Sequence, residues 1–362
     1  MNCPYTTLPA SSFWRQAVAE RSPSDLDPHL TARLRFGPDQ RVASAGSCFA
    51  QHISRALKER GYNYYVTEPA PPHLTPEQEE RFGYGLFSAR YGNVYSTLQL
   101  LQLVQRAFGA FRPADQFWTD RDGWVFDLLR PRITPRGYVS MVEAEADLKR
   151  HLQAVRKLIE TTDVFIFTLG LTECWVSKLD GTVYPTCPGC GSAGDFDDAK
   201  YAFHNLSVIE TTGYLAEAIN LMSAANPRLQ IILTVSPVPL AATMEPRHVL
   251  QATTYSKSVL RVAAEEMVRR YDNVHYYASY EIITNPKNAG RYFADDARSV
   301  TADGVARAMK LFFAQFTAED AGSEVRSAGD GTARRPTAPA AAPQIICDED
   351  EFYRALAARR SN

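Results

Sequence analysis

The chain has 362 residues, enough for one large α/β domain and a tail. Hydrophobic residues make up 45% and charged residues 22%, the balance of an ordinary globular protein. The 39 basic and 41 acidic residues give a net charge of −2, so the total charge favours neither nucleic acid nor an anionic membrane as partner.

The amino terminus and the cysteines indicate where the protein works. The start, MNCPYTTLPASSFW, lacks a basic segment followed by an apolar one, so we expect no signal peptide. Nor is any apolar run as long as a membrane span. The six cysteines are unevenly spaced, which favours reduced thiols. We therefore expect a cytoplasmic protein without a membrane partner.

Apolar runs and helical spacings alternate along the chain. The apolar runs are short and continuous, as in strands that are buried on both faces. In chain order, the predicted elements are a strand at 41–45, a helix at 49–61, a strand at 62–66, helices at 98–108 and 142–159, a strand at 163–170, a helix at 207–225, a strand at 229–237, a helix at 255–271, a strand at 274–282 and a helix at 301–316.

This alternation predicts an α/β fold, a three-layer α/β/α sandwich with a parallel sheet. Low-complexity composition separates the folded part from a tail. The predicted organisation is a lead-in at 1–40, a domain at 41–317 with loop-rich insertions at 109–140 and 176–205, a disordered linker at 318–344 and a short helix at 345–362. Within the first insertion, "DGW" predicts a hairpin turn.

Ser47 stands between the first predicted strand and the helix that follows it. Serine is among the best helix caps, and capping is the commoner role for a serine in this position. A nucleophile would occupy the same place, because helix N–H groups beside it stabilise a developing oxyanion. Gly46 would allow a tight turn and the close approach of a substrate. The pattern alone leaves both roles open.

The motif "AGSCFAQHI" contains Gly46-Ser47-Cys48-Phe49-Ala50, and this run resembles the signature of the GSCFA family. Further matching motifs occur in the family's order: "FTLGLTECW", "LTVSPVPL", "TTYSKSVLR", "SYEIIT" and "RYFADD". The resemblance covers about residues 10–317. That family is similar to the SGNH (GDSL-like) hydrolases and acyltransferases. The resemblance implies a flavodoxin-like sheet with Ser47 as the acyl-accepting nucleophile.

A catalytic serine needs a base, and the chain has seven histidines. Of these, His248 follows "SPVPL" at the expected active edge of the sheet, so we predict His248 as the base. SGNH enzymes usually carry Asp-x-x-His near the carboxyl terminus. Here Asp296 fits the aspartate, but Ser299 stands at the histidine position. A carboxylate such as Asp295, Asp296 or Glu173 could act instead, or catalysis could be lost.

The oxyanion donors are predicted by the same resemblance. "GLTE" (Gly170 to Glu173) occupies the place of a Gly-x-Asn-Asp block, so Thr172 or backbone N–H groups would donate. Asn93, after Gly92, would be a second donor. Glu173 is expected either to form a structural ion pair or to act as a carboxylate of the site. Cys48 would pack against the sheet or act as a thiol nucleophile.

Cys187-Pro-Gly-Cys190 could bind zinc together with Cys174 and His204. Its spacing is irregular and there is no second CxxC, which favours ordinary loop thiols. We therefore expect no metal and no cofactor. The sequence predicts a serine esterase or O-acyltransferase for an acylated carbohydrate or small ester, with no nucleic-acid partner. The alternatives are a binding or scaffold protein on a degenerate SGNH fold and a protein held together by zinc.

Overall fold

The computed structural model describes residues 3–29, 33–190 and 195–317. The predicted linker and carboxyl-terminal helix lie outside these residues. In chain order, the helices and strands are β1 (Val42–Gly46), α1 (Ala50–Glu59), α2 (Pro76–Arg81), α3 (Thr97–Ala107), β2 (Phe117–Thr119), β3 (Val125–Asp127), α4 (Met141–Thr161), β4 (Val164–Leu169), β5 (Glu173–Ser177), β6 (Val183–Tyr184), β7 (Tyr201–Asn205), α5 (Val208–Ala225), β8 (Gln230–Val235), α6 (Val249–Arg270), β9 (Val274–Tyr277), α7 (Ser279–Thr284) and α8 (Ala302–Phe316).

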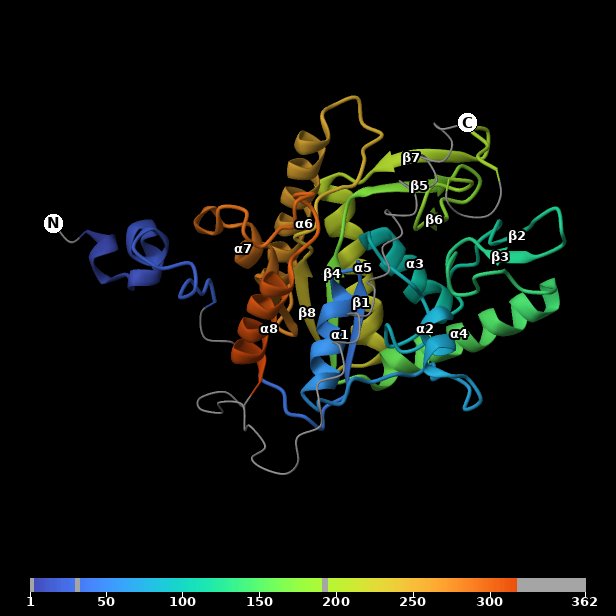
Figure 1. Cartoon of the computed structure of the whole chain (residues 1–362), viewed down its shortest axis with the longest axis horizontal. Helices are drawn as coiled ribbons and strands as arrows, with labels where there is room; N and C mark the ends of the chain where they lie inside the picture. Colours follow the sequence, from blue (N-terminus) through green and yellow to red (C-terminus); the bar gives the residue numbers. More distant parts are fainter. Residues whose placement is uncertain (1–2, 30–32, 191–194, 318–362) are drawn as a thin grey trace, which may run out of the picture.

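The central sheet is parallel, with the strand order β1-β4-β8-β9 (Figure 1). Its strands are the continuous apolar runs of the sequence, and their burial on both faces explains that pattern. All four strands point the same way, so the loops after them gather at one edge. In open α/β sheets this edge is where ligands bind.

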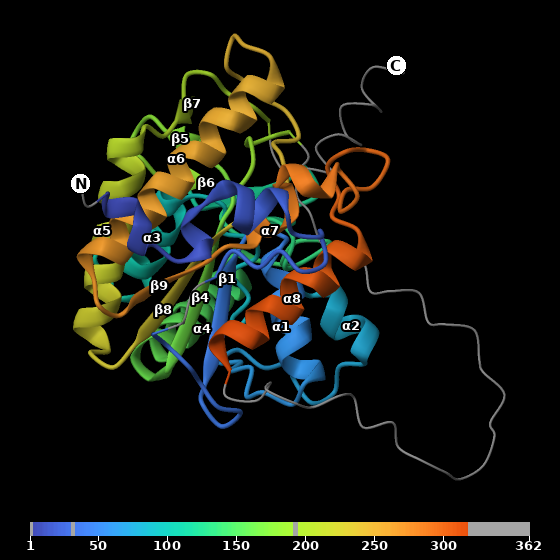
Figure 2. The same cartoon turned by 90° about the vertical axis from the view of Figure 1, so that its left-hand side faces the viewer.

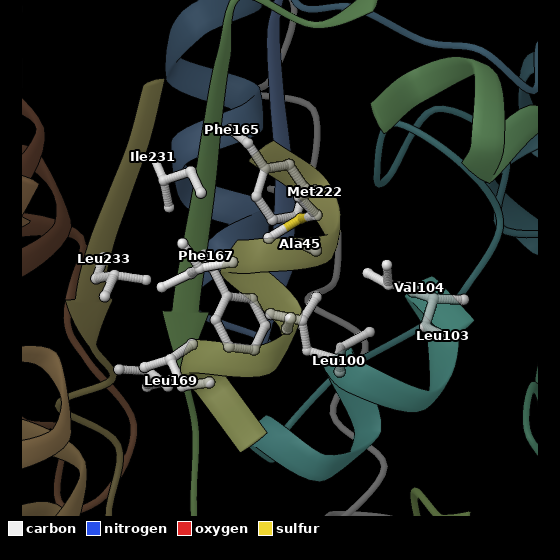
Figure 3. Packing of buried hydrophobic residues seen from close by; sticks show 14 of the residues in the cluster. Ala45, Leu100, Leu103, Val104, Phe165, Phe167, Leu169, Met222, Ile231 and Leu233 are labelled. Atoms are coloured by element: carbon white, nitrogen blue, oxygen red, sulfur yellow. The ribbon is translucent and has the colours of Figure 1, made fainter. Parts of the chain in front are cut away.

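Helices cover both faces of the sheet and complete three layers (Figures 1 and 2). On one face, Phe165 and Phe167 of β4 pack with Leu100 of α3 and Met222 of α5 (Figure 3). On the other face, α1 and α8 bury their apolar stripes against the sheet, with Phe312 of α8 fully buried. The predicted fold class is confirmed.

Serine and threonine caps fix where several helices begin. Each cap side chain accepts a hydrogen bond from a backbone N–H in the first turn, where the helix itself offers no partner. These caps are Ser96 of α3, Ser140 of α4, Ser207 of α5 and Thr301 of α8. The predicted cap at Thr301 is thus confirmed.

Three predicted segments differ from the structure. Residues 62–66 form only a parallel bridge between Tyr64 and Val42 of β1. They thereby take the place of an edge strand in the flavodoxin-like order 2-1-3-4-5. The loop-rich segment at 176–205 contributes to an antiparallel sheet of order β6-β5-β7, seen above the central sheet in Figure 1. The predicted strand at 274–282 ends at Tyr277 and continues as helix α7.

The predicted hairpin turn at "DGW" is confirmed. Strands β2 and β3 pair antiparallel around it, and Gly123 has φ +86°, which glycine adopts readily. The described part of the lead-in forms short helical turns between Pro4 and Ala19, and residues after them contact the core. Arg307 of α8 donates a hydrogen bond to the Leu26 carbonyl at 2.8 Å, and the His29 ring stacks on Tyr277 of β9.

Candidate active site

Ser47 lies directly after β1, at the carboxyl edge of the sheet. Its side chain does not cap α1, whose N-cap residue is Phe49 and whose cap forms no side-chain hydrogen bond. The Ser47 residue is 3% exposed, and its Oγ has no hydrogen-bond partner among the residues that the structure describes. The capping interpretation is therefore wrong. The hydroxyl stabilises no neighbour, which leaves it available for chemistry.

Two glycines bring the ends of β1 and β4 close together around this serine. Gly46 has φ +140°, and a Cβ there would lie 2.5 Å from the Thr168 carbonyl oxygen. At Gly170, a Cβ would lie 3.2 Å from the Ser47 Cβ and 3.1 Å from the Tyr95 carbonyl oxygen. The Ser47 N–H donates to the Thr168 oxygen at 3.2 Å. Only glycine fits at Gly46, since both its space and its φ exclude a side chain.

Asn93 reaches the site from the segment before α3. The Val94 N–H donates to the Gly46 carbonyl at 2.9 Å, which fixes this segment against the end of β1. The Asn93 side chain is buried, and its Oδ1 accepts from Gln51 Nε2 at 3.5 Å. Gln51 lies one turn after Ser47 on α1. The structure thus places the segment that carries the predicted donor Asn93 against the end of β1, the strand that Ser47 follows.

The "GLTE" segment is less suited to oxyanion binding than we expected. The N–H groups of Gly170 and Leu171 both donate to the Tyr95 carbonyl, at 2.9 and 3.2 Å. The Thr172 N–H donates to Ser256 Oγ at 3.0 Å, and the Thr172 hydroxyl donates to Asn205 Oδ1 at 2.7 Å. These donors are already engaged within the fold. Asn93 and Cys48, the other predicted donors, are buried, and their role in oxyanion binding stays a prediction.

Glu173, at the start of β5, forms no ion pair among the described residues. Its carboxylate accepts from the Thr243 hydroxyl at 2.6 Å and from the Met244 N–H at 3.2 Å. Burial raises the pKa of Glu173 above its ordinary value. The carboxylate lines a cavity of about 140 Å³ together with Trp175 and Phe203. The expected structural ion pair is thus not found among the described residues, and the role of a site carboxylate stays a prediction.

Lys257 is a residue near the site to which the sequence analysis gave no role. It lies within α6 and is 2% exposed. Its Nζ donates to the Gly170 carbonyl at 2.6 Å, and its neighbour Ser256 binds the Thr172 N–H. Lys257 therefore holds the glycine that packs against Ser47. The available signal was a Ser-Lys pair in "YSKSV", inside a helix that packs on the sheet.

Among the described residues, neither His248 nor Asp296 forms a hydrogen bond with Ser47 Oγ, which has no partner there. The exposed His248 caps α6, and its Nδ1 accepts from the Leu250 N–H at 3.1 Å. Asp296 accepts from the Ser299 hydroxyl at 2.6 Å and does not orient His248. In the part of the chain that the structure describes, the predicted hydrogen bonds from Ser47 to His248 and from His248 to Asp296 are not formed. Both side chains instead stabilise local turns.

The cysteine loop shows no metal site within the described part of the chain, where no group of three or more His, Cys, Asp or Glu residues could hold an ion. His204 faces Cys174 across β5 and β7, but its Nε2 binds Glu210 Oε1 at 2.8 Å. Burial raises the pKa of Cys174 to about 12, so this thiol stays protonated at neutral pH.

The family model of the GSCFA family matches residues 41–312, which is most of the chain and includes every strand described above. The chain belongs to the GSCFA family. The predicted resemblance is thereby confirmed. A search of curated proteins finds no match for this GSCFA chain. Among the described residues, none of its helices is long and apolar enough to cross a membrane.

Solved structures give weak similarities to this GSCFA chain. A carbohydrate esterase of family 3 from Talaromyces cellulolyticus matches with a TM-score of 0.36 and 10% identity, over 75% of this chain and 94% of that one. A carbohydrate esterase of family 2 with a carbohydrate-binding domain, from Corynascus thermopiles (Myceliophthora fergusii), matches with a TM-score of 0.30 and 14% identity, over 80% and 70%. At these TM-scores neither similarity carries an argument about activity.

Proposed function

We propose that this protein is a serine-dependent esterase or O-acyltransferase with Ser47 as the nucleophile. The observation that carries the proposal is the Ser47 hydroxyl itself. It is buried at the carboxyl edge of a parallel sheet and has no hydrogen-bond partner among the described residues. A buried polar group without a partner costs free energy, so a functional reason for it is expected.

In the proposed reaction, Ser47 Oγ attacks the ester carbonyl carbon and loses its proton to a base. The tetrahedral oxyanion takes hydrogen bonds from Asn93 and the Cys48 backbone. The bond to the leaving alcohol then breaks, and that alcohol takes up the proton, which leaves an acyl group on Ser47. Water resolves the acyl-enzyme in a hydrolase, and a second alcohol resolves it in a transferase.

The proposed substrate is an acylated carbohydrate or a small ester. The cavity of about 140 Å³ that Glu173 lines supports a compact substrate, because Leu171, another of its lining residues, directly follows Gly170, which packs against Ser47. Its aromatic walls, Trp175 and Phe203, would hold an apolar face, and Glu173 would accept a hydrogen bond from a hydroxyl group. No cofactor enters this reaction.

His248 remains the proposed base and Asp296 its proposed orienting carboxylate. Both would have to leave their local hydrogen bonds, with residues 236–248 folding over the sheet edge. Catalytic hydrogen bonds are often absent without substrate and form in the Michaelis complex. His248→Ala should lower turnover, while the loss of its exposed cap should cost only about 0.5 kcal/mol of stability. Unchanged turnover in His248→Ala would remove the base assignment and leave that of Ser47 standing.

Hydrolysis of p-nitrophenyl acetate tests the proposal, with Ser44→Ala as the matched control for Ser47→Ala. Ser44 is a buried serine of the same strand, and its hydroxyl shares a hydrogen bond of 3.0 Å with the Tyr64 hydroxyl. We expect Ser47→Ala to abolish turnover and keep wild-type stability. Ser44→Ala should keep turnover and lose about 1 kcal/mol of stability. Wild-type turnover in Ser47→Ala would overturn the proposal.

The second candidate is a binding protein that does not turn over its ligand. It is favoured by the hydrogen bond between Asp296 and Ser299, which occupies the place of the usual Asp-x-x-His pair. In that case wild-type protein would show no turnover that depends on Ser47. It would still bind an ester at the cavity beside Glu173.

A further inference from the structure

A second polar site lies between α3 and the segment after β3. It is a cavity of about 20 Å³, room for one small group, and Ser47 does not line it. Two arginines line it, Arg106 of α3 and Arg130. We propose that Arg106 and Arg130 form a buried binding site for a small monovalent anion, either a halide or the carboxylate of a ligand.

Arg106 is a buried guanidinium group without a counter-charge in contact. It is 7% exposed, and its Nε and Nη2 have no hydrogen-bond partner among the residues that the structure describes. Burial lowers the pKa of Arg106 to about 10, so the group is still a cation at neutral pH. An unpaired buried cation is costly, and an anion in the cavity would offset that cost.

Arg130 offers a third unused donor to the same cavity. Its Nε binds Asp127 at 2.8 Å and its Nη2 binds Asp147 at 3.0 Å. These two carboxylates use the nitrogens on one side of the guanidinium group. The buried Nη1 has no partner in the described part of the chain. Arg130 is thus held in place by its ion pairs and keeps one N–H group for an occupant.

The other polar side chains of the cavity do not accept from these arginines. The Gln99 carbonyl oxygen accepts from the Tyr95 N–H at 2.8 Å, and the Gln102 carbonyl oxygen accepts from the Val183 N–H at 2.8 Å. Their amide groups donate to the Asn93 and Gly181 carbonyls. Neither glutamine therefore pairs with the arginines, whose unused N–H groups are the donors that an anion requires.

A neighbouring cavity of about 40 Å³ adjoins this site. The two cavities share Tyr91, Leu129 and Arg130 as lining residues. The larger one is also lined by Gln51 and Asn93, which are joined by a hydrogen bond of 3.5 Å. A carboxylate bound by the arginines could thus belong to a ligand that reaches toward Asn93. This extension rests on the proposed function, whereas the anion site itself does not.

Anomalous diffraction from crystals soaked in sodium bromide tests the site. We expect a bromide peak between Arg106 and Arg130 in the wild type, and the loss of that peak in Arg106→Met. Arg112→Met, at an exposed position shortly after α3, is the matched control and should keep the peak. Because the wild-type crystal alone decides the matter, a folding defect in Arg106→Met would leave the test intact.

A second soak with bromide and excess sodium formate distinguishes the two sources of the anion. Loss of the bromide peak in formate assigns the site to carboxylates, and its retention assigns the site to free halide. A wild-type crystal with bromide elsewhere and only water between the two arginines would overturn the proposal. Because the assay reads density and not turnover, it stands whether or not Ser47 is a nucleophile.

Discussion

The end of β1 and the loops around His248 and Asp296 are built in opposite ways. At the end of β1, backbone hydrogen bonds and two glycines fix Ser47, and its hydroxyl is left unused. In the loops, the exposed side chains of His248 and Asp296 accept hydrogen bonds from residues two or three positions further along the chain. The fold therefore fixes the position of the proposed nucleophile in advance. A base, by contrast, would have to be brought to it by a change in the loops.

The largest expected effect comes from breaking the fixed region at Gly46. In Gly46→Ala, the new methyl group would lie 2.5 to 2.7 Å from backbone and side-chain atoms of Thr168, at φ +140°. We expect the free energy of unfolding to fall by roughly 3 kcal/mol, as measured by chemical denaturation. Gly213→Ala in α5 is the control, since no atom lies within 4 Å of its new Cβ. A Gly46→Ala protein as stable as wild type would show that this strand end is not fixed.

A smaller effect is expected when the support behind Gly170 is removed. Lys257→Met deletes the buried hydrogen bond to the Gly170 carbonyl, so the free energy of unfolding should fall by about 2 kcal/mol. Turnover at a temperature well below both melting points should also fall, because Gly170 packs against Ser47. The exposed Lys157→Met on α4 serves as the control. If only stability fell and turnover did not, Lys257 would have a structural role alone.

The smallest effect concerns pH and Glu173. Its raised pKa means that the folded protein holds this proton more tightly than the unfolded chain does. The stability this gives is fully present below the unfolded pKa of about 4.5 and is lost as pH rises through the folded pKa. Glu173→Gln should therefore gain stability relative to wild type as pH rises from 4 to 7.

Melting temperatures measured across this pH range check the Glu173 prediction. Glu145→Gln, at an exposed position of α4, is the matched control. A difference between Glu173→Gln and wild type that does not change with pH would contradict a buried carboxylate with a raised pKa. Glu173 would then titrate like a solvent-exposed carboxylate of the loops and would not belong to the fixed region.

Features that depend on neighbours in the chain could be predicted from the sequence. The apolar runs gave the strands of the central sheet, and Thr301 was expected as the cap of α8. The turn at Gly123 followed from local chemistry in the same way. The resemblance in "GSCFA" singled out Ser47 as the candidate nucleophile. Only the structure could show that the Ser47 side chain does not cap α1.

Features that depend on contacts between distant segments could not be predicted. Lys257 of α6 reaches Gly170 in the loop after β4, and the Ser-Lys pair in its own helix does not indicate which carbonyl it contacts. Arg106 and Arg130 meet at one cavity only because α3 packs near the segment after β3. The partner of His248 could not be predicted either, because the position of a histidine in a loop does not fix the direction of its ring.

The central claim is that the Ser47 hydroxyl is a nucleophile, and the position of a covalent adduct tests it most directly. Wild-type protein would be treated with a fluorophosphonate probe, digested and analysed by tandem mass spectrometry. The account predicts an adduct on the peptide that contains Ser47, which is absent in Ser47→Ala and retained in Ser44→Ala. An adduct on another residue, or equal labelling of Ser47→Ala and wild type, would contradict it.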